Sequence, residues 1–312
     1  MQGYKTHVQS GILLNANEAS QNVNETVKQE IIDAISNLSL NRYPDTTCHQ
    51  LHRLYAEVMN VPSSWILSGN GSDQMLGFLI QYYLQENKIL YTLSPDFSMY
   101  DYYVGLNHSK IEKYETNQDG SFDVETFISN GKDKNVDMVL FSNPNNPTGH
   151  SITLSEMKKI SEAFKDIPVI FDEAYMEFGK ESAVCLLKEY PNVFVCRTLS
   201  KAYGLAGIRC GFMISSQVEK LSALFIPYAL SSVTQTIASV VLRHADEYKD
   251  TIATIISERE RMYQEVKEFK QLTMYPSNAN FLFGRSEKRI CCLQCLKKRI
   301  SRFEIMKMQV FV

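Results

Sequence analysis

Short apolar, β-rich runs alternate with helical runs from about residue 63 onward, and this alternation limits the fold more than any other feature of the chain. Amphipathic helices are expected at residues 72–84 and 155–165. The apolar runs are residues 88–93, 136–142, 168–171, 193–197 and 210–214. Strands that are apolar on both faces and separated by helices are typical of a mostly parallel sheet covered on both sides. The sequence therefore predicts an α/β fold with such a sheet.

The bulk composition narrows the possible functions. The 312 residues have a net charge of −3 and contain no long basic run of the kind that favours a nucleic-acid surface. No apolar stretch approaches the ~20 residues that span a bilayer. Residues 1–11 lack the apolar core of a secretory signal. These features predict a soluble cytoplasmic protein without a nucleic-acid or membrane partner.

The seven cysteines are scattered, and only Cys292 and Cys295 have a C-x-x-C spacing, with Cys291 beside them. A zinc site needs a second such pair or nearby histidines, and no such pair follows in the sequence. We therefore predict reduced thiols and no metal ion.

Polar motifs follow three of the predicted strands. Residues 143–149 (Asn-Pro-Asn-Asn-Pro-Thr-Gly) follow the run that ends at residue 142, Asp172 follows residues 168–171, and Lys201 comes soon after residues 193–197. Ligands of such sheets bind beyond the carboxyl ends of the strands. The three motifs are therefore predicted to meet in one crevice.

Asp172, Lys201 and a further segment, residues 68–73, also have an ordinary structural interpretation. Residues 68–73 (Ser-Gly-Asn-Gly-Ser-Asp) precede a helix, and they can cradle a phosphate or simply cap the helix. Lys201 can be a nucleophilic buried amine or a solvated loop lysine. Asp172 can pair with a pyridinium nitrogen or form a structural salt bridge. The sequence contains neither a Walker A loop nor a G-x-G-x-x-G motif.

Three segments, in this order, resemble the fold-type-I pyridoxal phosphate (PLP) aminotransferases of classes I and II. They are residues 143–149, residues 172–175 (Asp-Glu-Ala-Tyr) and residues 197–209 (Arg-Thr-Leu-Ser-Lys-Ala-Tyr-Gly-Leu-Ala-Gly-Ile-Arg). Supporting segments are residues 15–18, 42–45, 69–73, 95–100 and 227–228. Within the group, the chain most resembles the histidinol-phosphate aminotransferases, from about residue 12 to about residue 285.

The resemblance implies PLP as the cofactor and a role for each matching residue. Lys201 would bind the PLP aldehyde as a Schiff base and later act as the base. Asp172 would pair with the ring nitrogen, and Phe97 would stack on the ring. Asn146 and Tyr175 would bind the phenolic oxygen. The cofactor phosphate would be bound by Ser72, Asp73, Thr198, Ser200, Arg209 and, from the partner subunit of a homodimer, Tyr43.

The resemblance also implies an organisation and a reaction. Residues 36–245 would form the PLP-binding large domain, and residues 1–35 and 246–312 would form a smaller α/β domain from both termini. The reaction would be transamination between a small-molecule amino donor and a 2-oxo acid, in histidine biosynthesis from L-histidinol phosphate to 2-oxoglutarate. Another aromatic or amino-acid aminotransferase and a threonine-phosphate decarboxylase share much of this pattern.

After Arg285 the sequence departs from the family pattern. The family binds the substrate carboxylate with an arginine in an Arg-Ile-Ser/Thr segment. Arg302 is the candidate for an upstream family arginine, and the final one has no counterpart. We therefore expect a truncated or altered C-terminus, with PLP binding retained and slow turnover. A PLP-binding protein without turnover is the alternative from a different functional class.

Overall fold

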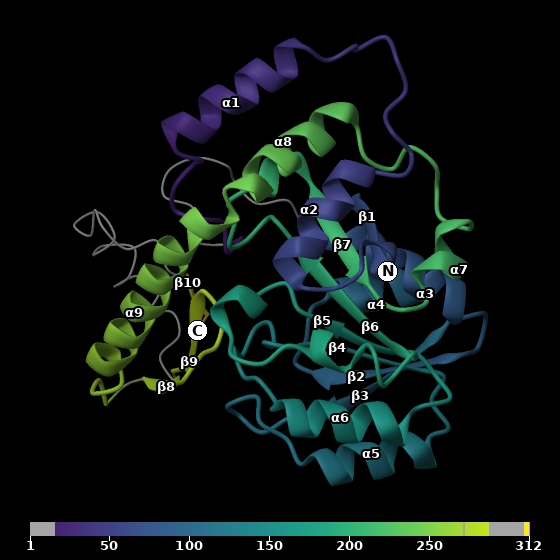
Figure 1. Cartoon of the computed structure of the whole chain (residues 1–312). Helices are drawn as coiled ribbons and strands as arrows, with labels where there is room; N and C mark the ends of the chain where they lie inside the picture. The colour runs from purple at the N-terminus through teal and green to yellow at the C-terminus, as the bar shows by residue number, and fades with distance from the viewer. Residues whose placement is uncertain (1–15, 271, 287–308, 312) are drawn as a thin grey trace.

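The computed structural model describes residues 16–270, 272–286 and 309–311. In this part of the chain the main sheet has seven strands in the order β1-β7-β6-β5-β4-β2-β3 (Figure 1). Strand β7 is antiparallel to both β1 and β6, and the other pairings are parallel. The predicted α/β fold with a mostly parallel sheet is confirmed. The strands are β1 (Ile66–Asn70), β2 (Ile89–Ser94), β3 (Lys110–Glu115), β4 (Met138–Ser142), β5 (Val169–Asp172), β6 (Val193–Thr198) and β7 (Cys210–Ile214).

Helices cover both faces of this sheet, which explains why its central strands are apolar along their whole length. Side chains of α3, α4 and α7 pack with Ile170 on one face. Side chains of α2, α5, α6 and α8 pack with Val169 and Phe171 on the other. The helices are α1 (Glu25–Ser36), α2 (His49–Met59), α3 (Ser72–Tyr83), α4 (Met99–Leu106), α5 (Val124–Asp133), α6 (Leu154–Ala163), α7 (Val218–Ser222), α8 (Ser232–Arg243) and α9 (Tyr248–Val266).

A second, smaller sheet lies beside α9 (Figure 1). Its described strands are β8 (Thr273–Tyr275), β9 (Phe281–Arg285) and β10 (Gln309–Phe311), in the order β10-β9-β8. Strand β9 is antiparallel to β8 and parallel to β10. The strand expected at residues 280–283 is thus β9, and the charged helix expected at residues 246–270 is α9. The domain boundaries at residues 35 and 245 stay a prediction.

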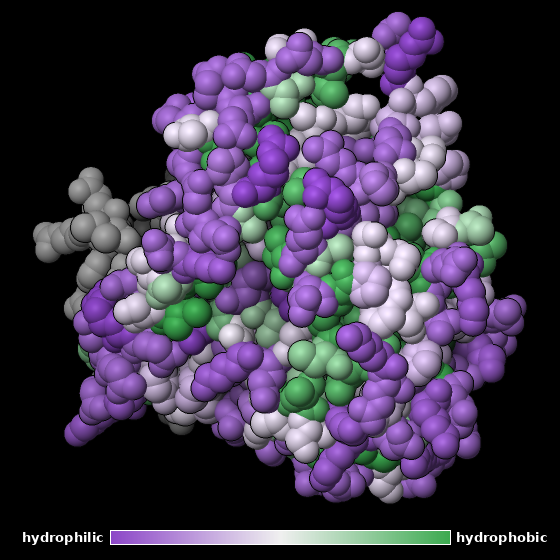
Figure 2. Space-filling model, in the orientation of Figure 1, coloured by the Kyte–Doolittle hydropathy of each residue, from purple (hydrophilic) through white to green (hydrophobic). Residues whose placement is uncertain are grey.

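Hydrophilic side chains cover most of the face seen in Figure 2, with smaller apolar areas between them. None of the helices described is long and apolar enough to cross a membrane.

Candidate active site

The carboxyl ends of β4, β5 and β6 lie at one level of the sheet. Ser142 pairs with Asp172, and Asp172 pairs with Cys196 on the next strand. Side chains alternate between the two faces of a strand. Asp172 therefore lies on the same face as Ile170, which packs against α3 and α4. The register and the alternation together bring the ends of three strands to the same edge on the same face.

A pocket lies at this edge, and it contains every predicted cofactor residue except Tyr43. Ser142 and Ala174 also line it and were not predicted. The lining residues are Ser72, Asp73, Phe97, Ser142, Asn146, Asp172, Ala174, Tyr175, Thr198, Ser200, Lys201 and Arg209. Tyr43 is 82% exposed and stacks on Tyr228, with 4.7 Å between the ring centroids. Arg302, Cys291, Cys292 and Cys295 lie outside the described residues.

One part of the lining offers hydroxyl, backbone and guanidinium donors. Helix α3 begins at Ser72, directly after Gly71, whose φ of 83° is in the region that favours glycine. An added Cβ at Gly211 would lie 2.1 Å from the Ser72 nitrogen, so only glycine lets β7 approach the start of α3 this closely. Arg209 Nη2 lies 2.7 Å from Asp73 Oδ2. A helix start with nearby hydroxyls and a guanidinium can bind a phosphate.

The Asp172 carboxylate is 3% exposed at the end of β5. Its Oδ2 accepts a hydrogen bond from the Tyr100 hydroxyl at 2.9 Å, and its Oδ1 accepts one from the Ala174 N–H at 3.2 Å. Burial raises the pKa of Asp172 to about 7, and the donated hydrogen bonds oppose that rise. In its ionised form, a buried carboxylate with these two hydrogen bonds can bind a cationic ring nitrogen.

The Lys201 amine also faces this pocket. Its Nζ donates to the backbone oxygen of Ala16 at 2.6 Å and lies 5.6 Å from the centre of the Tyr175 ring. Burial lowers the pKa of Lys201 to about 8, although the charges of Asp73 and Glu18 oppose this shift. A lysine with a lowered pKa is more often unprotonated near neutral pH, and that form is nucleophilic.

Two lining residues are held by groups that were not predicted. The Asn146 N–H donates to Ser142 Oγ at 2.9 Å. Ser142 Oγ in turn donates to the buried carboxyl of Asp96, whose pKa burial raises to about 8. The Tyr175 hydroxyl accepts from Asn17 Nδ2 at 2.8 Å. Ser142 and Asp96 are 46 residues apart in sequence, and Asn17 and Tyr175 are 158 residues apart. No local sequence pattern could have identified these two contacts.

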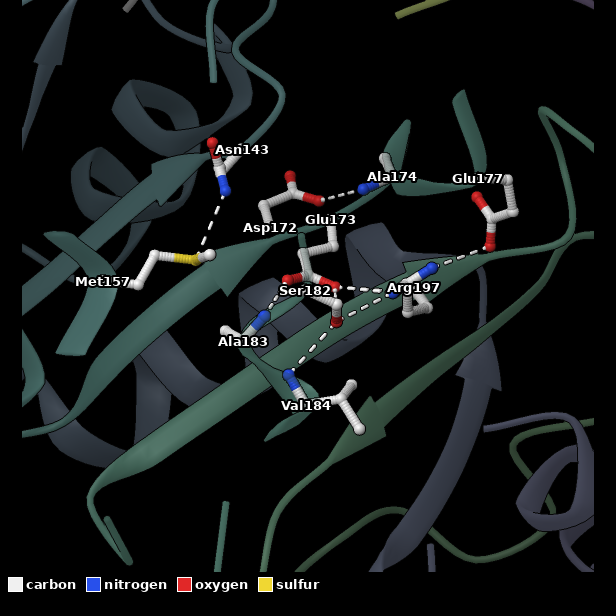
Figure 3. A network of polar contacts seen from close by, with 10 residues as sticks. All are labelled: Asn143, Met157, Asp172, Glu173, Ala174, Glu177, Ser182, Ala183, Val184 and Arg197. Carbon is white, nitrogen blue, oxygen red and sulfur yellow. Dashed lines mark hydrogen bonds and ion pairs between the residues drawn. The ribbon is translucent and has the colours of Figure 1, made fainter. Parts of the chain in front are cut away.

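A buried ion network lies on the opposite face of the same strand ends (Figure 3). Arg197 Nη2 lies 2.7 Å from Glu173 Oε2, and Arg197 Nη1 lies 3.0 Å from Glu177 Oε1. Ser182 Oγ donates to Glu173 at 2.7 Å, as does the Ala183 N–H at 2.6 Å. Glu173 follows Asp172 and Arg197 precedes Thr198, so this pair joins the two strand ends that carry pocket residues.

Comparison with known proteins identifies the family. The model of the family "Aminotransferase class I and II" matches residues 9–288. The histidinol-phosphate aminotransferase of Clostridium novyi is 34% identical over 278 residues, which are 88% of this chain and 78% of that protein. That of Pyrococcus furiosus is 36% identical over 273 residues, or 87% of this chain and 78% of that protein.

Solved structures show the same fold. The histidinol-phosphate aminotransferase of Sinorhizobium meliloti in complex with pyridoxal-5'-phosphate aligns with a TM-score of 0.82 at 22% identity, covering 95% of this chain and 80% of that chain. The enzyme of Clostridium acetobutylicum aligns with a TM-score of 0.81 at 21% identity, covering 91% and 86%. The chain therefore belongs to the class I and II aminotransferases and is a PLP-dependent aminotransferase.

Proposed function

We propose that the pocket residues hold PLP in the way that the sequence resemblance implies. The donors of Ser72, Thr198, Ser200 and Arg209 suit a dianionic phosphate. In the described structure the hydrogen-bond partners of the buried Asp172 are a hydroxyl and a backbone N–H, and neither carries a positive charge. A protonated ring nitrogen supplies the charge that these partners lack. The residues present therefore fit the cofactor.

When bound, PLP supplies a ring that accepts the electrons left on an amino acid's α-carbon after loss of its proton. Asp172 would keep the proton on the ring nitrogen. Asn146 and Tyr175 would bind the phenolic oxygen, and the Phe97 ring would cover one face. Lys201 would hold the cofactor covalently. When its amine is free, Lys201 Nζ would accept the proton from the substrate's α-carbon, because its lowered pKa of about 8 leaves part of the amine unprotonated near neutral pH.

The proposed reaction is the transfer of the amino group of L-histidinol phosphate to 2-oxoglutarate, which gives imidazole acetol phosphate and L-glutamate in histidine biosynthesis. The observation that carries this proposal is the sequence identity of 34% and 36% to two histidinol-phosphate aminotransferases. An enzyme of this kind releases its first product before the second substrate binds, so ping-pong kinetics are expected.

A homodimer with shared sites is the proposed assembly. Tyr43 and Tyr228 expose 82% and 46% of their surfaces, and Leu40 and Ile226 expose 77% and 60%. Large apolar side chains exposed together favour an interface. In such a dimer Tyr43 would reach the cofactor phosphate of the partner subunit.

The test is an assay of the PLP-loaded protein with L-histidinol phosphate and 2-oxoglutarate, in which glutamate formation is followed by a coupled dehydrogenase. Lys201→Ala serves as the inactive control. Glutamate formation from this donor supports the proposal. Faster glutamate formation from an aromatic amino acid, or carbon dioxide release from threonine phosphate, would assign the site to one of the alternative enzymes. PLP binding without turnover of any of these substrates would favour a binding protein.

A further inference from the structure

Tyr100 does not line the pocket, yet it contacts the residue on which the cofactor's ring nitrogen depends. It is the second residue of α4 and is 1% exposed. Its hydroxyl donates to Asp172 Oδ2 at 2.9 Å. The ring of Phe97, which does line the pocket, stands nearly perpendicular to the Tyr100 ring, with 5.7 Å between the centroids. Tyr100 therefore lies behind both the carboxylate and the stacking ring.

The surroundings of Asp172 oppose its ionisation. Burial raises its pKa, and so do the negative charges of Asp73 and Glu173. The negative charge of Asp172 in turn raises the pKa values of the buried Asp96 carboxyl and the buried Cys196 thiol. The Lys201 ammonium in the pocket attracts Asp172, but the effect on Lys201 is smaller than that of burial. A strong donor is therefore needed to keep this carboxylate charged.

The Tyr100 hydroxyl is suited to be that donor. Burial and the neighbouring carboxylates raise its pKa well above the usual value, so it stays protonated throughout the working pH range. A hydrogen bond to the charged form of an acid favours that form. Each carboxylate oxygen accepts two hydrogen bonds, so the contact leaves room for a ring N–H.

We propose that Tyr100 is a positioning residue for the cofactor, because it holds Asp172 ionised and oriented toward the pyridinium nitrogen of PLP. This inference rests on the proposed role of Asp172. Tyr100 itself touches neither cofactor nor substrate.

The size of the effect follows from one hydrogen bond. Loss of a hydrogen bond to a charged group shifts a pKa by roughly one to two units. In Tyr100→Phe the pKa of Asp172 should therefore rise from about 7 by that amount. At pH 6 the ionised fraction of Asp172 would then be roughly ten- to a hundredfold smaller than in the parent, whereas near pH 9 at least about half of it would be ionised in both proteins. A ligand that needs the carboxylate loses affinity only in the lower range.

The probe is pyridoxamine phosphate, which has no aldehyde and so forms no covalent link to Lys201. Its affinity for the cofactor-free full chain is measured by calorimetry from pH 6 to pH 9. Tyr100→Phe should weaken binding roughly ten- to a hundredfold at pH 6 and by no more than about twofold at pH 9. An analogue with carbon in place of the ring nitrogen should bind both proteins equally at every pH.

Two further variants make the result decisive. Tyr91→Phe removes the hydroxyl of another buried tyrosine, which donates to the Phe127 oxygen at 3.1 Å, and should leave the pH profile unchanged. In an Asp172→Asn background, Tyr100→Phe should cause no further loss. A loss that is equal at all pH values, or that extends to the carbon analogue, would overturn the inference and assign Tyr100 to packing. If Asp172→Asn itself leaves pyridoxamine phosphate binding unchanged, the proposed role of Asp172 fails, and that of Tyr100 fails with it.

Discussion

The ion network behind the pocket should be essential for stability, and replacement of Arg197 tests this. The Arg197 side chain is 6% exposed, and those of Glu173 and Glu177 are 0% and 9% exposed. In Arg197→Met the cation is lost, while two buried glutamates and Ser182 Oγ lose their shared donor. Removal of one partner of a buried ion pair typically costs about 3–5 kcal/mol, because the remaining charge stays buried without compensation. We expect the upper part of this range, because one arginine serves two carboxylates.

The expected fall in melting temperature is about 10 °C, since each kcal/mol corresponds to roughly 2–4 °C in a chain of this order of size. The assay is thermal unfolding of the PLP-saturated protein at pH 5.5 and pH 8. Burial raises the pKa of Glu173 above its usual value, and the Arg197 charge opposes the rise. Without Arg197 that pKa rises further. The loss of stability caused by the uncompensated Glu173 charge is then absent below pH 4.5, near the pKa of Glu173 in the unfolded chain. It grows as the pH rises toward the pKa of Glu173 in the folded protein.

The variant should therefore lose more stability at pH 8 than at pH 5.5. A second variant that combines Arg197→Met with Glu173→Gln and Glu177→Gln removes the buried charges altogether, and it should recover most of the lost stability. If Arg197→Met melts within about 2 °C of the parent at both pH values, or if the triple variant is less stable than Arg197→Met, the reasoning is wrong.

Three other changes address the cofactor site. Lys201→Ala should abolish the visible absorbance of the PLP-loaded protein, and borohydride should attach the cofactor to Lys201 in the parent; a label on another lysine would contradict the assignment. Tyr43→Phe should weaken PLP binding by about 1.5–3 kcal/mol, as measured by equilibrium titration, whereas a native monomer with undiminished PLP affinity would refute the shared site. Gly211→Val places a side chain 2.1 Å from the Ser72 nitrogen, so affinity for pyridoxamine phosphate should fall while circular dichroism shows a folded protein.

The sequence predicted the core of the sheet well because burial on both faces leaves an unambiguous pattern. The run at residues 210–214 coincides with β7. The run at residues 136–142 contains β4, and the run at residues 193–197 covers all of β6 except Thr198. Two strands of the main sheet were missed for physical reasons. Strand β3 is the edge strand and reads Lys-Ile-Glu-Lys-Tyr-Glu, so it has no apolar run. Strand β1 contains Gly69 and Asn70, which have low strand propensity, and pairing with β7 outweighs that local preference.

The pocket was predictable to the extent that its residues stand in recognisable segments. Ser142 adjoins such a segment and Ala174 lies within one, yet neither was predicted to line the pocket, since neither residue type by itself indicates a ligand. Tyr100 and Asp96 act through contacts that span 72 and 46 residues, and such contacts depend on how α4 and the strand ends pack. Chemistry that depends on residue type can be read from one segment, whereas support from behind a site requires the fold.

The alternation of side chains along the strands explains how one stretch of sequence serves both purposes. Asp172 and Glu173 are adjacent, as are Arg197 and Thr198, but successive side chains point to opposite faces. Asp172 and Thr198 therefore line the pocket, while Glu173 and Arg197 form an ion pair on the other face. A carboxylate at either position could have paired with the buried arginine, and the sequence alone did not decide which one would. Because the face decides it, Arg197 compensates Glu173 and leaves Asp172 available for the cation of the cofactor.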